Sequence, residues 1–370
     1  MQFIDLPAQQ KRIKDTINNN ISRIMQSCSF INGPEVVAIE EKLAGYAGVK
    51  YAVGCSSGTD ALLMPLMAYG LKPGDAVFTT PFTFIATAEV IALLGATPVF
   101  VDIEKDTFNI DTAMLEEAIK SVKSEGKLIP RAIIPVDLFG QCADYDEINA
   151  IAKKHGLFVL EDAAQSFGAM YKGRKASSLA HASATSFFPA KPFGCYGDGG
   201  MTFTDSKDLY DKLVSIRVHG QGSDKYNNVR IGINGRLDTI QAAVLLAKFE
   251  IFEEEIQLRQ KVASKYSDGL KDSVTVPFVK PHNISVWAQY SIMHPERDKI
   301  ISRLKDNGIP TAVYYPKPLH VQDAFAYLGH RLGDFPASEL VARKIFSLPM
   351  HPYIEEKDQE RIIDIIKKYV

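Results

Sequence analysis

Short apolar segments alternate with segments of helical length through residues 51–161, and this alternation limits the folds open to the chain. The apolar segments lie at 51–55, 76–80, 97–102, 131–136 and 157–161. Helical patterns lie between them, at 61–69, 84–93, 112–122 and 144–155. Strands that are apolar throughout and separated by helices are typical of a parallel sheet with helices on both faces. We therefore predict an α/β fold with a mostly parallel central sheet.

The flanking sequence predicts further helices and a second, smaller unit. Residues 9–27 and 34–46 are expected to be helical, and a long helical pattern opens at Asp238 and continues beyond Leu258. Past about residue 255 the pattern is that of an α+β unit, with strands near 285–293 and 310–314 and helices at 298–307, 337–346 and 355–368. We predict a large domain of residues 1–250 and a small C-terminal domain of residues 251–370, divided within or beside a helix.

Composition excludes several classes of protein. The 370 residues carry a net charge of −2, which gives no electrostatic reason to expect nucleic-acid binding. No apolar run approaches the roughly 18 residues of a membrane span, and the N-terminus has no signal-peptide pattern. The four cysteines form no CxxC pair, so neither disulfides nor a structural metal site is expected. A cytoplasmic enzyme is the natural expectation.

Lys191 lies in an apolar, glycine-rich stretch, residues 185–200. Desolvation makes an ammonium group costly there, so the lysine is expected to be paired, neutral or covalently modified. Lysine amines form Schiff bases with carbonyl compounds, and pyridoxal 5′-phosphate (PLP) is the commonest partner. A surface lysine on a turn is the alternative interpretation.

Two strand ends carry side chains that suit the same cofactor. Asp162 ends an apolar strand at the edge where open α/β sheets bind ligands, and it could pair with a protonated pyridine nitrogen. Gln165, three residues later, could donate to a phenolic oxygen. Gly58 and Thr59 lie in a turn between a strand and a helix, where backbone N–H groups bind phosphate. The alternatives are that Asp162 and this turn simply cap the helices that follow.

Other segments offer weaker signals. Phe84 could stack on a planar ring or belong to the core. Asn234 and Arg236, just before the long helix, could bind an anionic group or cap that helix. The segment from Tyr314 and Tyr315 to His320 could form a lid contact or the exit of an edge strand.

The order of these features resembles the DegT-type nucleotide-sugar aminotransferases, which are fold-type I PLP enzymes, over nearly the whole chain from Ile4 to Met350. The resemblance implies that Lys191 holds PLP and moves protons, while Phe84 stacks on the ring. It implies contacts from Asp162 to the pyridine nitrogen and from Gln165 to the ring hydroxyl. It further implies a homodimer whose active sites are shared between subunits. The implied phosphate ligands are Gly58, Thr59, Ser186 and, from the second subunit, Asn234.

Residues 187–200, 230–243 and 252–255 most resemble the branch acting on UDP-2-acetamido-2-deoxy-3-oxo-glucuronate, which supplies diamino sugars for bacterial surface polysaccharides such as lipopolysaccharide O-antigen. Three positions depart from that pattern. Tyr314 replaces an expected histidine, Ala190 an expected serine and Phe30 an expected tyrosine. The residues expected to contact the sugar substrate are Phe30, Arg236, Tyr314, Tyr315 and His320.

The sequence therefore predicts amino transfer from L-glutamate, giving 2-oxoglutarate, to a nucleotide-linked keto sugar, with a UDP-linked 3-oxo sugar favoured over a 4-oxo sugar. A dehydratase of the same family would carry histidine in place of Lys191. A non-catalytic sensor on this fold would be expected to lose Lys191 or Asp162, and both are present. A nicotinamide dehydrogenase would need a G-x-G-x-x-G turn after its first strand, and none is found.

Overall fold

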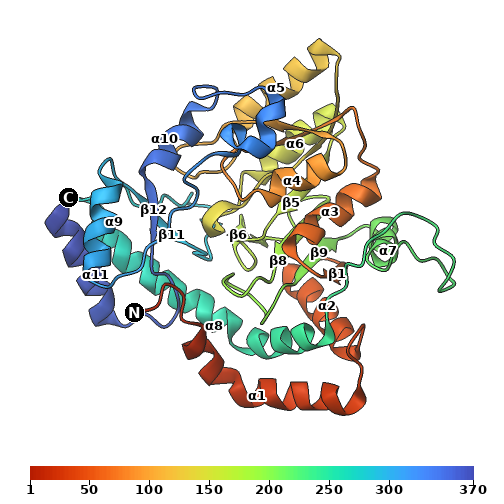
Figure 1. Cartoon of the computed structure of the whole chain (residues 1–370), viewed down its shortest axis with the longest axis horizontal. Coiled ribbons are helices and arrows are strands. Elements are labelled where there is room, and N and C mark those ends of the chain that lie inside the picture. Colours follow the sequence, from red (N-terminus) through yellow and green to blue (C-terminus); the bar gives the residue numbers. More distant parts are fainter.

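A seven-stranded sheet forms the centre of the chain in a computed structural model that describes all 370 residues (Figure 1). Its strand order is β1-β9-β8-β5-β4-β2-β3. Only β9 runs antiparallel to its neighbours, so the predicted mostly parallel α/β sheet is confirmed. In the order of the sheet the strands are Tyr51–Cys55, Gly200–Thr204, Ala182–Ser186, Phe158–Asp162, Ile129–Ile133, Asp75–Thr79 and Thr97–Phe100.

Helices cover both faces of this sheet because its strands are apolar on both sides. In β2, for example, Ala76 and Phe78 join one hydrophobic cluster and Val77 joins the other. The first cluster is covered by helices α2 (Pro34–Ala47), α5 (Thr112–Glu125), α6 (Tyr145–His155) and the first part of α8 (Thr239–Leu270). The second is covered by α3 (Gly58–Tyr69), α4 (Ala86–Leu93) and α7 (Lys207–Ile216).

A smaller unit surrounds the second half of α8. Strands β11 (Tyr290–Met293) and β12 (Ile345–Leu348) pair antiparallel. They pack with α9 (Arg297–Asp306) and α11 (Glu356–Tyr369) into a separate hydrophobic cluster. Because α8 runs without a break through residue 250, no tether separates the two units, and the domain boundary at 250 stays a prediction.

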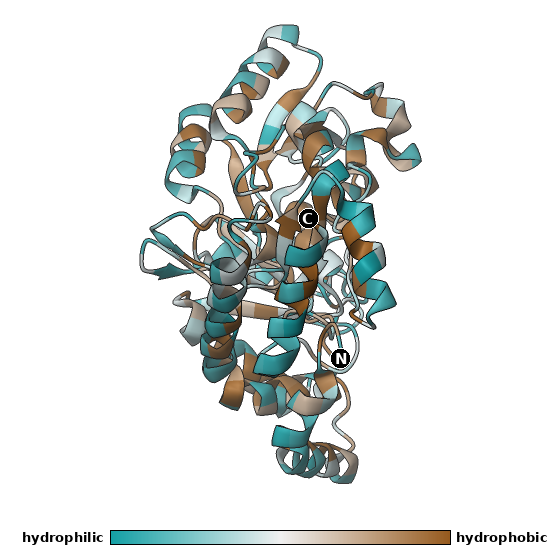
Figure 2. Cartoon of the chain, turned by 90° about the vertical axis from the view of Figure 1, so that its left-hand side faces the viewer, coloured by the Kyte–Doolittle hydropathy of each residue, from teal (hydrophilic) through white to brown (hydrophobic).

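Peripheral elements complete the chain. Helix α1 (Leu6–Ser27) lies along α8 (Figure 1). The surface helices carry both hydrophilic and hydrophobic residues, as helices that bury one face should (Figure 2). No helix combines the length and apolarity that a bilayer crossing requires. A second small sheet contains β6 (Met170–Tyr171), β7 (Arg174–Lys175) and β10 (Asn283–Ile284), and short 3-10 turns lie at Leu138–Gly140, Leu319–Val321 and Asp323–Leu328.

Two local predictions were wrong, and one helix was not predicted. Residues 310–314 do not form a strand, and only Ala312 makes an isolated bridge, to Ser347. Helix α10 (Pro336–Lys344) ends early because Ile345 starts β12, which pairs with β11. Helix α7 was missed although its buried residues Leu209, Leu213 and Ile216 have helical spacing. The helical spacing of α7 could have been found in the sequence. The pairing of β11 with β12 could not, because it joins residues more than 50 positions apart.

Asp102 attaches the start of α10 to the large sheet. Its carboxylate, 4% exposed, accepts hydrogen bonds from Ala337 N (2.8 Å), Ser338 N (2.9 Å) and Ser338 Oγ (2.6 Å). Asp102→Ala leaves these donors without an acceptor, so we expect the free energy of unfolding to fall by about 2–3 kcal/mol. Urea denaturation measures this change. The control, Asp106→Ala at an exposed position, should cost less than about 0.5 kcal/mol; equal losses would contradict the prediction.

Candidate active site

The carboxyl ends of β1, β5 and β8 meet at one edge of the central sheet. β5 and β8 are parallel, and β1 and β8 are each antiparallel to β9, so all three point the same way. The strand ends therefore bring together the turn after Cys55, Asp162 and Ser186. Ligands of open α/β sheets bind at such an edge.

The turn after β1 brings the start of α3 against Ser186. Ser57 caps the helix by accepting a hydrogen bond from Asp60 N at 3.0 Å, and the first N–H groups of α3 have no acceptor within the helix. A Cβ added to Gly58 would lie 2.6 Å from the Ser186 Cβ. Only glycine permits this approach, which gathers N–H groups and a hydroxyl where an anion can bind.

Asp162 is a buried carboxylate without an ion-pair partner in the chain. It is 4% exposed and accepts hydrogen bonds from Thr87 Oγ1 (2.8 Å) and Ala164 N (3.2 Å). Burial raises the pKa of Asp162, while the hydrogen bond from Thr87 and the nearby Lys191 ammonium act to lower it. A cationic ligand group would complete this arrangement.

Lys191 lies in the loop between β8 and β9. The loop is closed by hydrogen bonds from Lys191 N to Phe188 O (2.9 Å) and from Cys195 N to Phe187 O (2.7 Å). Lys191 is half-buried, and desolvation lowers its pKa while the Asp162 carboxylate acts to raise it. Its neutral amine is therefore easier to form than that of an ordinary lysine.

Cys195 has a structural position in this loop. Its Sγ lies 3.2 Å from Phe187 O and 3.1 Å from Gly197 O, and the side chain is fully buried. Burial raises the pKa of Cys195 to about 11, so the thiol stays protonated and unreactive. The residue holds the loop rather than contributing chemistry.

Gln165 connects the sheet edge to the segment after α9. Its Oε1 accepts a hydrogen bond from Phe139 N (2.8 Å), and its Nε2 donates to the Tyr315 hydroxyl (3.1 Å). Because a backbone N–H can only donate, the amide orientation is fixed with Nε2 turned toward Tyr315. Burial raises the pKa of Tyr315, so its hydroxyl remains protonated beside the site.

The remaining predicted residues are less closely placed. Phe84 is 57% exposed and Phe30 is 40% exposed, while Asn234 is exposed and accepts a hydrogen bond from Arg236 at 2.5 Å. Arg236 lines a polar hollow of about 430 Å³ beside the turn after β1, together with Ser56, Ser57, Asp198, Asp238 and Gln241. Tyr314 packs edge-on to Tyr315.

His320 is 1% exposed, and its Nε2 lies 3.1 Å from Glu339 Oε1 while its ring packs on Phe335. These contacts fix the segment after Tyr315, and a substrate contact of His320 stays a prediction. Sequence reasoning gave no role to Thr87, the hydroxyl donor to Asp162. Its position three residues after Phe84, at the start of α4, was the only available signal.

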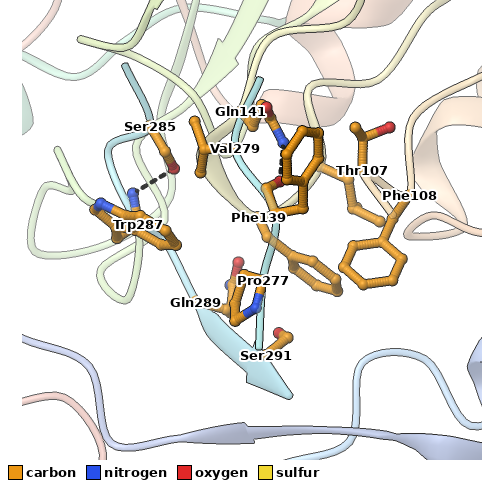
Figure 3. A pocket seen from close by; sticks show the side chains of 12 residues that line it. Thr107, Phe108, Phe139, Gln141, Pro277, Val279, Ser285, Trp287, Gln289 and Ser291 are labelled. Carbon is orange, nitrogen blue, oxygen red and sulfur yellow. Dashed lines mark hydrogen bonds between the residues drawn. The ribbon is translucent and has the colours of Figure 1, made fainter. Parts of the chain in front are cut away.

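A second hollow lies elsewhere, where residues 138–141 meet residues 277–291 (Figure 3). Phe108, Phe139 and Trp287 line it, each with a positive φ. Its volume of about 20 Å³ has room for one water only. This hollow is part of the seam between the two units, not a ligand site.

The comparisons with known proteins decide the family. The sequence profile of the DegT/DnrJ/EryC1/StrS aminotransferase family matches residues 11–367. The chain belongs to this family. It is 51% identical over 358 residues, 96% of each chain, to the UDP-2-acetamido-2-deoxy-3-oxo-D-glucuronate aminotransferase of Pseudomonas aeruginosa.

Solved structures of family members have the same fold. A DegT DnrJ EryC1 StrS aminotransferase from Brucella abortus superposes with a TM-score of 0.98 at 51% identity, covering 100% of this chain and 99% of that one. NtdA from Bacillus subtilis, solved with bound cofactor PMP, has a TM-score of 0.88 at 29% identity, with 99% and 83% of the two chains covered. The predicted resemblance and fold type are therefore confirmed.

The lowered pKa of the Lys191 amine can be tested directly through its chemical reactivity. We expect reductive methylation of Lys191 by formaldehyde to reach its midpoint at a pH below the ordinary lysine value of about 10.4. Because the Asp162 carboxylate stabilises the ammonium form, Asp162→Asn should move this midpoint lower still. Peptide mass spectrometry across a pH series measures it, with the exposed Lys14 as internal control. A midpoint at or above that of Lys14 would be the contrary result.

Proposed function

We propose that this family member is a PLP-dependent aminotransferase that moves the amino group of L-glutamate to a UDP-linked 3-oxo sugar. The observation that carries the proposal is the meeting of a lysine of lowered pKa, a buried carboxylate without an ion pair and a phosphate-type turn at one sheet edge. These three groups match the aldehyde, the pyridine nitrogen and the phosphate of PLP.

The residues fit the cofactor on independent grounds. Asp162 forms no salt bridge within the chain, although the Lys191 ammonium acts on it electrostatically, and a protonated pyridine nitrogen would supply a direct partner. The close approach of Gly58 to Ser186 places the first N–H groups of α3 beside the Ser186 hydroxyl, so Gly58, Thr59 and Ser186 would bind the phosphate. Gln165 Nε2 would donate to the ring hydroxyl, and Phe84 would lie against the ring face. Lys191 would hold the cofactor covalently.

Bound PLP would supply an electron sink for the carbanion formed when the substrate loses its α-proton. Lys191 Nζ would take that proton from the α-carbon of glutamate. In the second half of the reaction it would return a proton to the sugar carbon that gains the nitrogen. Its lowered pKa suits both directions, because the amine must accept and release a proton near neutral pH.

The sugar is proposed from the relative in Pseudomonas aeruginosa, whose substrate is a UDP-linked 3-oxo sugar. Arg236 in the polar hollow would bind an anionic part of the substrate. Tyr315, hydrogen-bonded to Gln165, would lie at the sugar side of the cofactor. Phe30, Tyr314 and His320 complete the proposed substrate region. The product would serve cytoplasmic synthesis of a bacterial surface polysaccharide such as lipopolysaccharide O-antigen.

A homodimer with shared sites is part of the proposal. The loop between α7 and Asn234 projects from the body of the protein (Figure 1). It exposes Tyr226 (85%), Val229 (54%) and Ile231 (84%), and an apolar surface of this kind is typical of an interface. In a symmetric dimer this loop would carry Asn234 toward the phosphate turn of the partner.

The cofactor chemistry is tested by absorbance. We expect a band near roughly 410–430 nm that moves to about 330 nm when glutamate is added. Lys191→Ala should abolish turnover of glutamate with the keto sugar, because it removes the amine that would hold the cofactor and move the proton. Lys105→Ala, at an exposed position outside the site, should retain both the band and the activity. A colourless wild-type protein, or an active Lys191→Ala variant, would refute the mechanism.

The same assay tests the sugar. UDP-linked 3-oxo and 4-oxo sugars are supplied in parallel after glutamate has converted the chromophore, and the return of the band near roughly 410–430 nm reports amino transfer. Faster return with the 3-oxo sugar supports the proposal. If the band returns with the 4-oxo sugar alone, the protein is still an aminotransferase, but the proposed position of the ketone is wrong.

Sharing of the sites is tested by mixing two inactive variants. Lys191→Ala and Asn234→Ala are refolded together, so that about half of the dimers are hybrids with one intact site each. We expect recovery of about a quarter of the wild-type activity. If Asn234 serves its own subunit, the hybrid would contain no intact site and the mixture would stay inactive.

A further inference from the structure

Two carboxyl groups lie buried beside Asp162 and have no role in the mechanism above. Asp137 follows β4 by four residues, and Glu161 lies in β5 immediately before Asp162. Both are 0% exposed. Their side chains are in hydrogen-bonding contact with each other. Two carboxyl groups in contact inside a protein cannot both be ionised, because repulsion adds to the cost of desolvation.

The hydrogen-bond donors around the pair are unequal. Asp137 accepts from the Tyr145 hydroxyl (2.9 Å), the Ser166 hydroxyl (2.8 Å) and Ala143 N (3.0 Å). Glu161 accepts only from two backbone groups, Ser177 N at 2.6 Å and Leu179 N at 3.1 Å. Since hydrogen bonds donated to a carboxylate stabilise its charge, Asp137 is the better place for the negative charge and Glu161 for the proton.

Neither carboxyl group forms a salt bridge. The titratable groups that act most strongly with the pair are Tyr145 from α6, the Cys142 thiol and Asp162, and none of them is basic. Burial raises the pKa of both carboxyl groups, and that of Glu161 well above its usual range. At most one of the two carboxyl groups is therefore ionised, and the three donors around Asp137 make it the group that carries the charge.

This charge lies next to the proposed cofactor contact. Asp137 N donates to the backbone carbonyl of Asp162 at 3.1 Å, and Val136 forms a parallel bridge with Asp162. The carboxylates of Asp137 and Asp162 act on each other electrostatically. A negative charge close to a protonated unit raises its affinity for the proton, and the effect is large where water is excluded.

We propose that Asp137 and Glu161 share one proton, held by Glu161, and that ionised Asp137 is a positioning residue whose charge retains the proton between Asp162 and the ring nitrogen of PLP. The first half of this inference is the proton shared by Asp137 and Glu161, and it does not depend on the proposed function. The second half is the effect of Asp137 on the ring nitrogen of PLP, and it rests on the proposed function. Asp137 touches neither cofactor nor substrate and acts through Asp162.

The first half is tested on the cofactor-free protein by infrared spectroscopy. A protonated buried carboxyl group has a C=O stretch separate from that of carboxylates, and the difference spectrum between wild type and Glu161→Gln at pH 7 should contain one such band. Absence of the band would overturn the shared proton. This result does not depend on whether the protein binds PLP.

The second half is tested by ¹⁵N NMR of protein loaded with PLP labelled at the ring nitrogen. Asp137→Asn removes the charge, so the pH at which the ring nitrogen loses its proton should fall by about one unit. Glu161→Gln replaces a neutral acid by a neutral amide and should shift it by less than about 0.3 unit. If Asp137 had a purely structural role, both variants would change in thermal stability, but the pH at which the ring nitrogen loses its proton would not differ between them.

Equal shifts in the two variants, or none in Asp137→Asn, would overturn the role of Asp137. If Asp137→Asn does not fold, Ser166→Ala removes one donor to Asp137 and keeps the carboxylate. It should give a smaller shift in the same direction, and an unchanged midpoint would likewise overturn the proposal. Failure of the wild type to bind PLP would instead refute the proposed function, while the infrared result would still decide the first half.

Discussion

The buried carboxylate of Asp162 is the group on which the rest of the site depends. A carboxylate at this depth is costly unless it is hydrogen-bonded and paired. The chain supplies the hydrogen bonds through Thr87 and Ala164 but no ion pair. The desolvation of this carboxylate is therefore offset only in part within the chain, which is the basis for proposing a cationic ligand group beside it.

The sheet topology turns separate sequence motifs into one site. The turn at Gly58 and the residues Asp162 and Ser186 follow strands that are far apart along the chain, yet the parallel order gathers their ends at one edge. Close packing then decides what fits there. Gly58 lies so near Ser186 that any side chain would close the gap, and the loop after Ser186 returns Lys191 toward Asp162.

Much of this could be predicted from the sequence because the relevant signals are local. Apolar strands that alternate with helices fixed the class of fold, and β1 was predicted with its observed bounds. The order of the motifs identified the family. Long-range pairing could not be predicted in the same way: residues 310–314 were wrongly expected to be a strand, and β12 was missed, because β11 takes its partner from more than 50 residues away.

Tertiary structure also decided the electrostatics. Nothing in the sequence around Asp137 or Glu161 indicates that these side chains touch, that both are fully buried or that Tyr145 and Ser166 both donate to Asp137. The amide orientation of Gln165 depends on Phe139 N, and the burial of His320 depends on Glu339 and Phe335. Each of these contacts joins residues from different elements.

The sequence by itself determined the fold class and the family, since these follow from local periodicity and from motif order, and it predicted the roles of Lys191 and Asp162. Only the tertiary structure decided which carboxyl groups are buried in contact with each other, which polar side chains remain accessible and how the pKa of Lys191 is lowered. The physical reason is that desolvation and charge interaction depend on distance in space, which the linear chain does not specify.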